Sequence, residues 1–282
     1  MAVYFVTGKL GSGKSLVCVG KIQDYLHQKR RVATNLDIYT DKLMSRKNKQ
    51  PIIRLPDKPR PVDLINLGYG TDKVDEDTNG LIVLDECGTW LNSRTWNDPE
   101  RAGFVDWMLH ARKYGWDILF IIQDISIVDK QIRMTMCEHL VMCRRLDRIR
   151  VPFLSSITQA IFGIRLTLPK IHRAKVHYGD NEQSIVSDVW SYRGHHLYPA
   201  YDTRQVFSED KLTLDDNEVD MRASYTLLSH WHIAGRYYQR RPLFNITNPI
   251  QLLLIPTWLL VQAVSKISNT PARSSGVLRS SS

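Results

Sequence analysis

Hydrophobic and polar positions in the first half of the chain are grouped in blocks. Apolar runs at residues 3–6, 81–84 and 118–122 have the length and continuity of strands buried on both faces of a parallel sheet. Residues 16–22 and 104–111 instead repeat their apolar positions at helical spacing. The order strand, helix, strand therefore predicts an α/β fold with a mostly parallel sheet flanked by helices.

The segment between the first apolar run and the first helical period is rich in glycine, lysine and serine. Its sequence GKLGSGKS fits the pattern G-x-x-x-x-G-K-[ST] of a P-loop NTPase, in the strand-to-helix context that the pattern requires. Glycines let backbone amides converge on an anion, and a helix N-terminus favours negative charge. The alternative is a glycine-rich turn that binds nothing. The predicted nucleotide-binding residues are Gly8, Lys9, Leu10, Gly11, Ser12, Gly13, Lys14 and Ser15.

A second candidate motif, GLIVLDECGTW, ends the apolar run at 81–84 with two acids, Asp85 and Glu86. Ligands of doubly wound sheets lie at the carboxyl ends of the strands, so these acids are expected to face the phosphate loop. We predict that Ser15 and Asp85 hold Mg²⁺ beside a bound ATP, and that Lys14 and Glu86 are catalytic, with Glu86 polarising an attacking water. This pair favours hydrolysis over transfer. The alternative is two acids that cap the next segment.

Two further sets of polar residues leave more than one interpretation open. Gln123 follows the apolar run at 118–122 and could contact the terminal phosphate, or could simply be the first polar residue after a buried strand. An arginine supplied by a neighbouring subunit can accelerate hydrolysis, while a run of charge is more often a solvated face. The arginine candidates are Arg94, Arg101, Arg112, Arg144, Arg145, Arg148 and Arg150.

Eight segments of the chain together resemble a known family: GKLGSGKS, TNLD at 34–37, LDECGTW at 84–90, residues 110–124, SIVDKQIR at 126–133, CRRLDRI at 143–149, LPK at 168–170 and AYDT at 200–203. On these segments the chain resembles the inner-membrane assembly ATPases of filamentous bacteriophages, the group that also contains the zonula occludens toxin proteins. This resemblance implies a cytoplasmic P-loop domain, one membrane crossing, and extrusion of phage through the host envelope while single-stranded DNA enters the particle. It also implies coat and secretin components of the assembly machinery as partners.

The net charge and the cysteine spacing agree with a cytoplasmic domain that meets a membrane or nucleic acid. The formal net charge of +9 suits anionic partners, such as nucleic acid or the cytoplasmic face of a membrane, without choosing between them. The four cysteines are scattered and no signal peptide is apparent, which predicts a reduced, cytosolic main domain. P-loop motors generally complete their sites between subunits, so we also expect a homo-oligomeric ring.

An uncharged stretch near the C-terminus, residues 246–264, is long enough to cross a bilayer, at about 28 Å for a helix. Arginines precede it at 236, 240 and 241, and this bias places the N-terminal domain on the cytoplasmic side of the host inner membrane, as a single-pass protein. A buried or interfacial helix is the alternative. The expected organisation is an ATPase domain at 1–204, a juxtamembrane linker at 205–245, a transmembrane helix at 246–264 and a short polar periplasmic tail at 265–282.

Two internal regions are less regular. Residues 41–61 are charged and contain prolines, which predicts a surface excursion between strands. Residues 170–202 contain short β-like pieces that either extend the sheet or form an appended subdomain. Their aromatic and basic residues resemble a surface for stacking single-stranded nucleic acid, although half-buried strand positions are the commoner outcome.

Three functional classes are consistent with the sequence. The first is a membrane-anchored ATPase that powers phage assembly and extrusion. The second is a nucleotide-gated assembly scaffold with little turnover. The third is a cytosolic P-loop kinase, which would leave the apolar stretch at 246–264 without a role.

Overall fold

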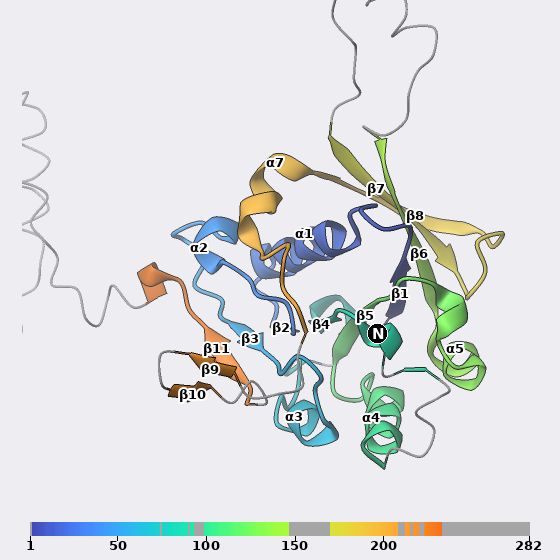
Figure 1. Cartoon of the computed structure of the whole chain (residues 1–282), viewed down its shortest axis with the longest axis horizontal. Coiled ribbons are helices and arrows are strands. Elements are labelled where there is room, and N and C mark those ends of the chain that lie inside the picture. Colours follow the sequence, from blue (N-terminus) through green and yellow to red (C-terminus); the bar gives the residue numbers. More distant parts are fainter. Residues whose placement is uncertain are drawn as a thin grey trace, which may run out of the picture. The chain divides into compact units, whose positions relative to one another are not determined.

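The computed structural model describes residues 2–73, 75–89, 91–92, 99–146, 170–207, 212–214, 217–219 and 223–232 (Figure 1). All of them belong to one compact unit, Met1–Ile233. The sequence's predicted membrane helix at 246–264 and polar tail lie outside the described residues. Within the described part, no helix combines the length and the apolar character needed to span a bilayer.

A nine-stranded sheet forms the centre of this unit, in the order β11-β3-β2-β4-β5-β1-β6-β7-β8. The strands from β3 to β6 in this order run parallel, while β11, β7 and β8 join antiparallel at the two edges. The strand bounds are β1 Val3–Thr7, β2 Val32–Thr34, β3 Ile52–Arg54, β4 Gly80–Leu84, β5 Trp116–Ile121, β6 His139–Arg145, β7 Ile171–Tyr178, β8 Val186–Arg193 and β11 Tyr225–Leu227. A separate hairpin pairs β9 Leu212–Leu214 with β10 Asn217–Val219.

Helices cover both faces of the sheet (Figure 1). One face packs against α1 (Lys14–His27), with α2 (Thr40–Leu43) and α7 (Gly194–Leu197) beside it. The other face packs against α3 (Pro61–Ile65), α4 (Pro99–His110) and α5 (Lys130–Met136). Short 3-10 helices of the described part complete the connections: η1 Glu76–Thr78, η2 Cys87–Thr89, η4 Ile125–Ile127 and η6 Tyr198–Ala200. The predicted arrangement, a mostly parallel sheet flanked by helices, is therefore confirmed.

The continuous apolar runs of the sequence become the central strands. All five residues of β4 and all six of β5 are buried, since helices cover both sides of these strands. The helical period that starts after the phosphate-loop motif becomes α1, whose buried residues include Leu16, Val19 and Ile22. Periodicity and strand length thus identified the elements that carry the site.

The structure decides the interpretation of three regions. The expected surface excursion at 41–61 contains β3, a sheet strand in which Ile52 and Arg54 are buried. The β-like pieces at 170–202 extend the sheet as β7 and β8, one of the two alternatives left open by the sequence, and His172, His177 and Trp190 are buried strand positions. Within the 205–245 segment assigned to a linker, β11 hydrogen-bonds to β3, so part of that segment belongs to the sheet.

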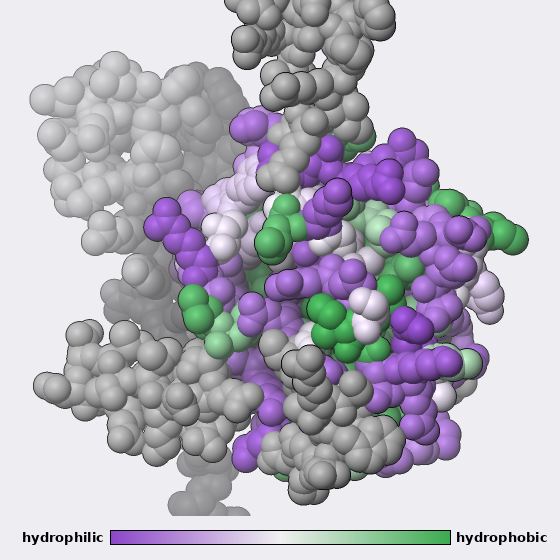
Figure 2. All heavy atoms as spheres, turned by 45° about the vertical axis from the view of Figure 1, so that its right-hand side comes forward, coloured by the Kyte–Doolittle hydropathy of each residue, from purple (hydrophilic) through white to green (hydrophobic). Residues whose placement is uncertain are grey.

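The molecular face in Figure 2 is mainly hydrophilic, with apolar residues in small separate patches. Strongly exposed apolar side chains of the described part include Leu10, Met134 and Ile185, which lie on different elements. Scattered apolar side chains are ordinary on a protein surface. The feature that calls for explanation is the cavity at the carboxyl edge of the sheet.

Candidate nucleotide site

Two glycines of the loop between β1 and α1 pack against other parts of the chain so closely that a side chain would not fit at either position. A Cβ on Gly13 would lie 1.9 Å from Nδ1 of His172, and a Cβ on Gly8 would lie 2.7 Å from the backbone oxygen of Cys143. Both glycines also have positive φ, 89° and 146°. Gly13 is the N-cap of α1, so the first backbone amides of this helix have no partners within the helix, and Gly13, Lys14 and Ser15 line the cavity beside the loop.

The side chains of the loop fit an anion. The ammonium group of Lys14 donates a hydrogen bond to the Gly8 oxygen at 2.9 Å, which holds a positive charge inside the loop. The hydroxyl of Ser12 is buried and has no hydrogen-bonding partner within the described part of the chain. A buried, unpaired donor beside a cation and a helix N-terminus matches the oxygens of a phosphate group.

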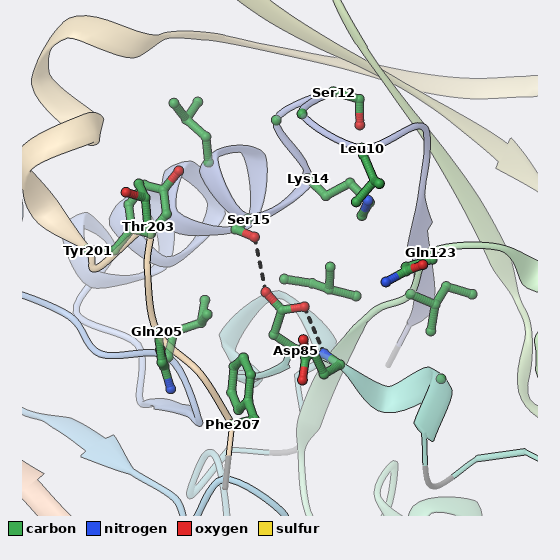
Figure 3. A pocket seen from close by; sticks show the side chains of 18 of the residues that line it. Leu10, Ser12, Lys14, Ser15, Asp85, Gln123, Tyr201, Thr203, Gln205 and Phe207 are labelled. Carbon is green, nitrogen blue, oxygen red and sulfur yellow. Dashed lines mark hydrogen bonds between the residues drawn. The ribbon is translucent and has the colours of Figure 1, made fainter.

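Ser15 and Asp85 meet although they are 70 residues apart in sequence. The Ser15 hydroxyl donates a hydrogen bond to Oδ2 of Asp85 at 3.0 Å (Figure 3). Magnesium sites on nucleotides use one or two protein oxygens together with phosphate oxygens and water. This hydroxyl and carboxylate have the chemistry and the proximity of such a pair.

Burial and neighbouring groups shift the pKa values of the two acids. Burial raises the pKa of Asp85, and the Glu86 backbone N–H, the Ser15 hydroxyl and Lys14 lower it in part. Burial also raises the pKa of Glu86, and the neighbouring Asp85 and Asp57 carboxylates add to this effect. Glu86 has a φ of 57°, an uncommon backbone conformation for a residue with a side chain. A carboxylate with a raised pKa is a better proton acceptor, as activation of a water requires.

Asn35 fixes the end of β4, and sequence reasoning did not identify this role. Its Oδ1 accepts from the Asp85 backbone N–H at 2.8 Å, and its Nδ2 donates to the backbone oxygens of Asp85 at 3.1 Å and Asp57 at 2.9 Å. The residue is fully buried. Asn35 therefore sets where the Asp85 backbone leaves the sheet. The only signal in the sequence was its place in the TNLD segment.

A segment distant in sequence closes the opposite side of the site. Residues 200–207, here called the strap, run alongside residues 35–39 and hydrogen-bond to them. Together with the phosphate loop and the ends of β4 and β5, the strap encloses a cavity of about 580 Å³. The volume lies within the range of roughly 300–1,000 Å³ common to small-molecule sites.

Most of the predicted nucleotide-binding residues line this cavity. They are Leu10, Gly11, Ser12, Gly13, Lys14 and Ser15, joined by Asp85, Glu86 and Gln123. Gln123 lies across the cavity from the strap (Figure 3). The strap residues that line it, and Leu36, were not identified from sequence as part of a site.

The arginine candidates do not join this cavity in the described part of the chain. Arg112 forms an ion pair with Glu76 at 2.7 Å. Arg144 and Arg145 lie on β6 and are absent from the cavity lining. Arg94, Arg148, Arg150 and the side chain of Arg101 lie outside what the structure describes. An arginine acting from a neighbouring subunit stays a prediction.

The phosphate loop follows β1, and the strand that carries the two acids, β4, is separated from β1 by β5 alone. This arrangement places the chain in the class of P-loop NTPase folds. The family model described as zonular occludens toxin (Zot) matches residues 2–179. The chain belongs to this family, and the resemblance seen in its motifs is confirmed.

Individual relatives agree with the family assignment. The gene 1 protein of Enterobacteria phage M13 is 51% identical over 242 residues, which are 85% of this chain and 67% of that protein. The gene 1 protein of Salmonella phage IKe is 44% identical over 278 residues, covering 95% of this chain and 74% of that protein.

Solved structures show weaker likeness. The N-terminal domain of zonular occludens toxin from Neisseria meningitidis matches with a TM-score of 0.43 and 16% identity, covering 71% of this chain and 98% of that one. The DNA-packaging ATPase B204 of Sulfolobus Turreted Icosahedral Virus matches with a TM-score of 0.40 and 12% identity, covering 68% of this chain and 97% of that one.

Proposed function

We propose that this protein is a membrane-anchored ATPase that powers the assembly and extrusion of filamentous phage particles through the host envelope, using ATP and Mg²⁺. The observation that carries the proposal is the Ser15–Asp85 hydrogen bond of 3.0 Å beside the glycine-lined loop. The identity to gene 1 proteins of phages M13 and IKe supports the phage context.

The loop would bind the phosphates through its own groups. The amides at the start of α1 and the Ser12 hydroxyl donate to phosphate oxygens, and Lys14 exchanges its contact with the Gly8 oxygen for the outer phosphates. Ser15 and Asp85 would hold Mg²⁺, which when bound would neutralise charge on the phosphate oxygens. These contacts would hold the triphosphate in the loop, beside the carboxyl edge of the sheet.

Glu86 would act on the attacking water. Its position next to Asp85 places a proton acceptor at the same edge, and its raised pKa favours proton uptake. Gln123 lines the cavity on the Lys14 side and can orient the water or contact the terminal phosphate. The combination of a base and a water-orienting amide suits hydrolysis rather than transfer to an acceptor.

The cellular placement rests on the sequence. A helix at 246–264 would anchor the protein in the host inner membrane, with the N-terminal domain in the cytoplasm. Proposed partners are a ring of identical subunits, the coat and secretin components of the assembly machinery, and single-stranded phage DNA. Recovery in the membrane fraction after an alkaline carbonate wash tests the anchor, and release into the supernatant would reject it.

Turnover of the Glu86→Gln variant tests the enzymatic part. The full-length protein in detergent should hydrolyse ATP in a Mg²⁺-dependent manner, with a response to single-stranded DNA. Glu86→Gln should bind ATP as tightly as the wild type and lose at least about a hundredfold in turnover. Normal phage production by this variant would instead favour the nucleotide-gated scaffold.

A further inference from the structure

The two ends of the cavity differ in charge. Lys14 and the amides of the loop stand at one end, where they suit phosphate. The strap lines the other end with Tyr201, Asp202, Thr203, Gln205 and Phe207, and none of these side chains is cationic. Among the described residues at this end, a phosphate would meet the Asp202 carboxylate and no cationic side chain, so this end suits a different part of a ligand.

The strap end combines apolar surface with hydrogen-bonding groups. Leu36, Tyr201 and Phe207 supply apolar and aromatic surface, while Asp202 and Thr203 supply a carboxylate and a hydroxyl. Aromatic faces suit a nucleobase, and a carboxylate suits the hydroxyl groups of a ribose. In Figure 3, Tyr201 and Thr203 lie on the side of Ser15 away from Lys14 and Gln123. A nucleotide that extends from the loop past Ser15 therefore reaches the strap with its nucleoside end.

The strap is held in place before any ligand binds. The Gln205 amide donates to the Asn35 oxygen and accepts from the Asp37 backbone N–H, both at 2.8 Å. The Asp202 backbone N–H donates to the Asp37 oxygen at 3.0 Å. Gln205 is thus used as an anchor, and ligand recognition is left to its neighbours. A preformed wall binds with less loss of conformational entropy than a loop that must order.

We propose that the strap forms the nucleoside subsite of the nucleotide site, in which Phe207 and Tyr201 contact the base and Asp202 and Thr203 bind the ribose. The inference rests on the proposed ATP site. It adds a binding element about 190 residues after the phosphate loop in sequence and explains the AYDT segment at 200–203, for which the phosphate chemistry gives no role.

Competition between ATP and inorganic tripolyphosphate separates the two ends of the site. Both ligands are titrated, with Mg²⁺, into the full-length protein in detergent. Phe207→Ala should weaken ATP binding on the order of tenfold, which is the loss expected for one base–aromatic contact. Its affinity for tripolyphosphate should stay within about twofold of the wild-type value. Asp202→Asn keeps an oxygen that accepts the turn hydrogen bond from the Arg204 backbone N–H. It should weaken ATP binding by roughly threefold and leave tripolyphosphate binding unchanged.

Val206→Ala is the matched control, because Val206 is a strap residue that is 84% exposed and does not line the cavity. It should change neither affinity. The inference is overturned if ATP and tripolyphosphate bind equally well to the wild type, or if Asp202→Asn leaves ATP affinity unchanged. It is also overturned if Asp202→Asn increases the affinity for tripolyphosphate, because Asp202 would then face the phosphates. If Phe207→Ala misfolds and binds neither ligand, the ATP affinity of Asp202→Asn alone tests the inference.

Failure of the proposed function gives a different result. In that case neither ATP nor tripolyphosphate binds to the wild type, or Lys14→Ala leaves both affinities intact. Binding of both ligands that depends on Lys14 but not on the strap would retain the ATP site and reject the nucleoside subsite.

Discussion

Replacing Asn35 with alanine removes the side chain that holds the end of β4. Three hydrogen bonds are lost: one accepted from the Asp85 backbone N–H, and two donated to the backbone oxygens of Asp85 and Asp57. Because Asn35 is completely buried, water cannot readily replace these partners. The change should both destabilise the fold and shift Asp85 away from Ser15.

The magnitude follows from the number of bonds. A net contribution of about 1 kcal/mol for each bond, and a further penalty for backbone groups left buried without partners, give a loss of roughly 3–4 kcal/mol in the free energy of unfolding. Urea denaturation should show a lower midpoint with an unchanged slope. Under native conditions, Mg²⁺-dependent turnover should fall at least about tenfold while tripolyphosphate binding in the absence of metal is retained, since the loop itself is untouched.

Asn48→Ala provides the control. The Asn48 amide also donates to a backbone oxygen, that of Leu26 at 2.8 Å, but it does not line the cavity. The Asn48 Oδ1 also accepts from the Gln50 backbone N–H at 3.0 Å, so this variant should lose about 1–2 kcal/mol of stability and keep its turnover. The reasoning is refuted if Asn35→Ala loses less than about 1 kcal/mol, or if it is strongly destabilised yet turns over ATP like the wild type.

Other consequences of the structure can be measured separately. Gly13→Ala should lose tripolyphosphate binding and at least about 2 kcal/mol of stability in urea denaturation, because it combines a φ of 89° with a Cβ 1.9 Å from His172; wild-type behaviour would contradict the loop geometry. Burial raises the pKa of Asp85, so its charged form costs stability. This cost is absent below the unfolded-state pKa and complete above the folded-state pKa. Without metal, Asp85→Asn should therefore be at least as stable as the wild type at pH 8, with the difference shrinking toward pH 4; a variant clearly less stable at pH 8 would reject this. All four cysteines are free, and burial raises the pKa of each thiol, so iodoacetamide should label the native protein far more slowly than the unfolded protein when followed by mass spectrometry; equal rates would contradict their burial.

The sequence analysis predicted the elements that are determined by residues close together in the sequence. β4 and β5 are continuous apolar runs because both of their faces are covered, and the glycines of the phosphate loop mark a backbone that must approach an anion. The pairing of Ser15 with Asp85 followed from the rule that ligands lie at the carboxyl ends of parallel strands. The strands and the loop follow from local pattern alone, and the Ser15–Asp85 pairing follows from a general rule of sheet topology.

The remaining features depend on contacts between distant residues. β3 is three residues long and ends in Arg54, whose charge suggested a surface, yet this guanidinium is buried between Asp37 at 2.9 Å and Asp57 at 2.7 Å. The strap meets Asn35 across 170 residues of sequence. Neither the compensation of a buried charge nor such a distant pairing leaves a periodic signal, so pattern reasoning could not place them.

Manganese binding measured by electron paramagnetic resonance tests the central claim, that Ser15 and Asp85 form one metal site on a bound nucleotide. The full-length protein is titrated with Mn²⁺, with and without a non-hydrolysable ATP analogue. The wild type should bind one Mn²⁺ per chain only when the nucleotide is present, and Ser15→Ala and Asp85→Asn should each weaken that binding at least about tenfold. Nucleotide-dependent Mn²⁺ affinity that is unchanged in Asp85→Asn would contradict the account.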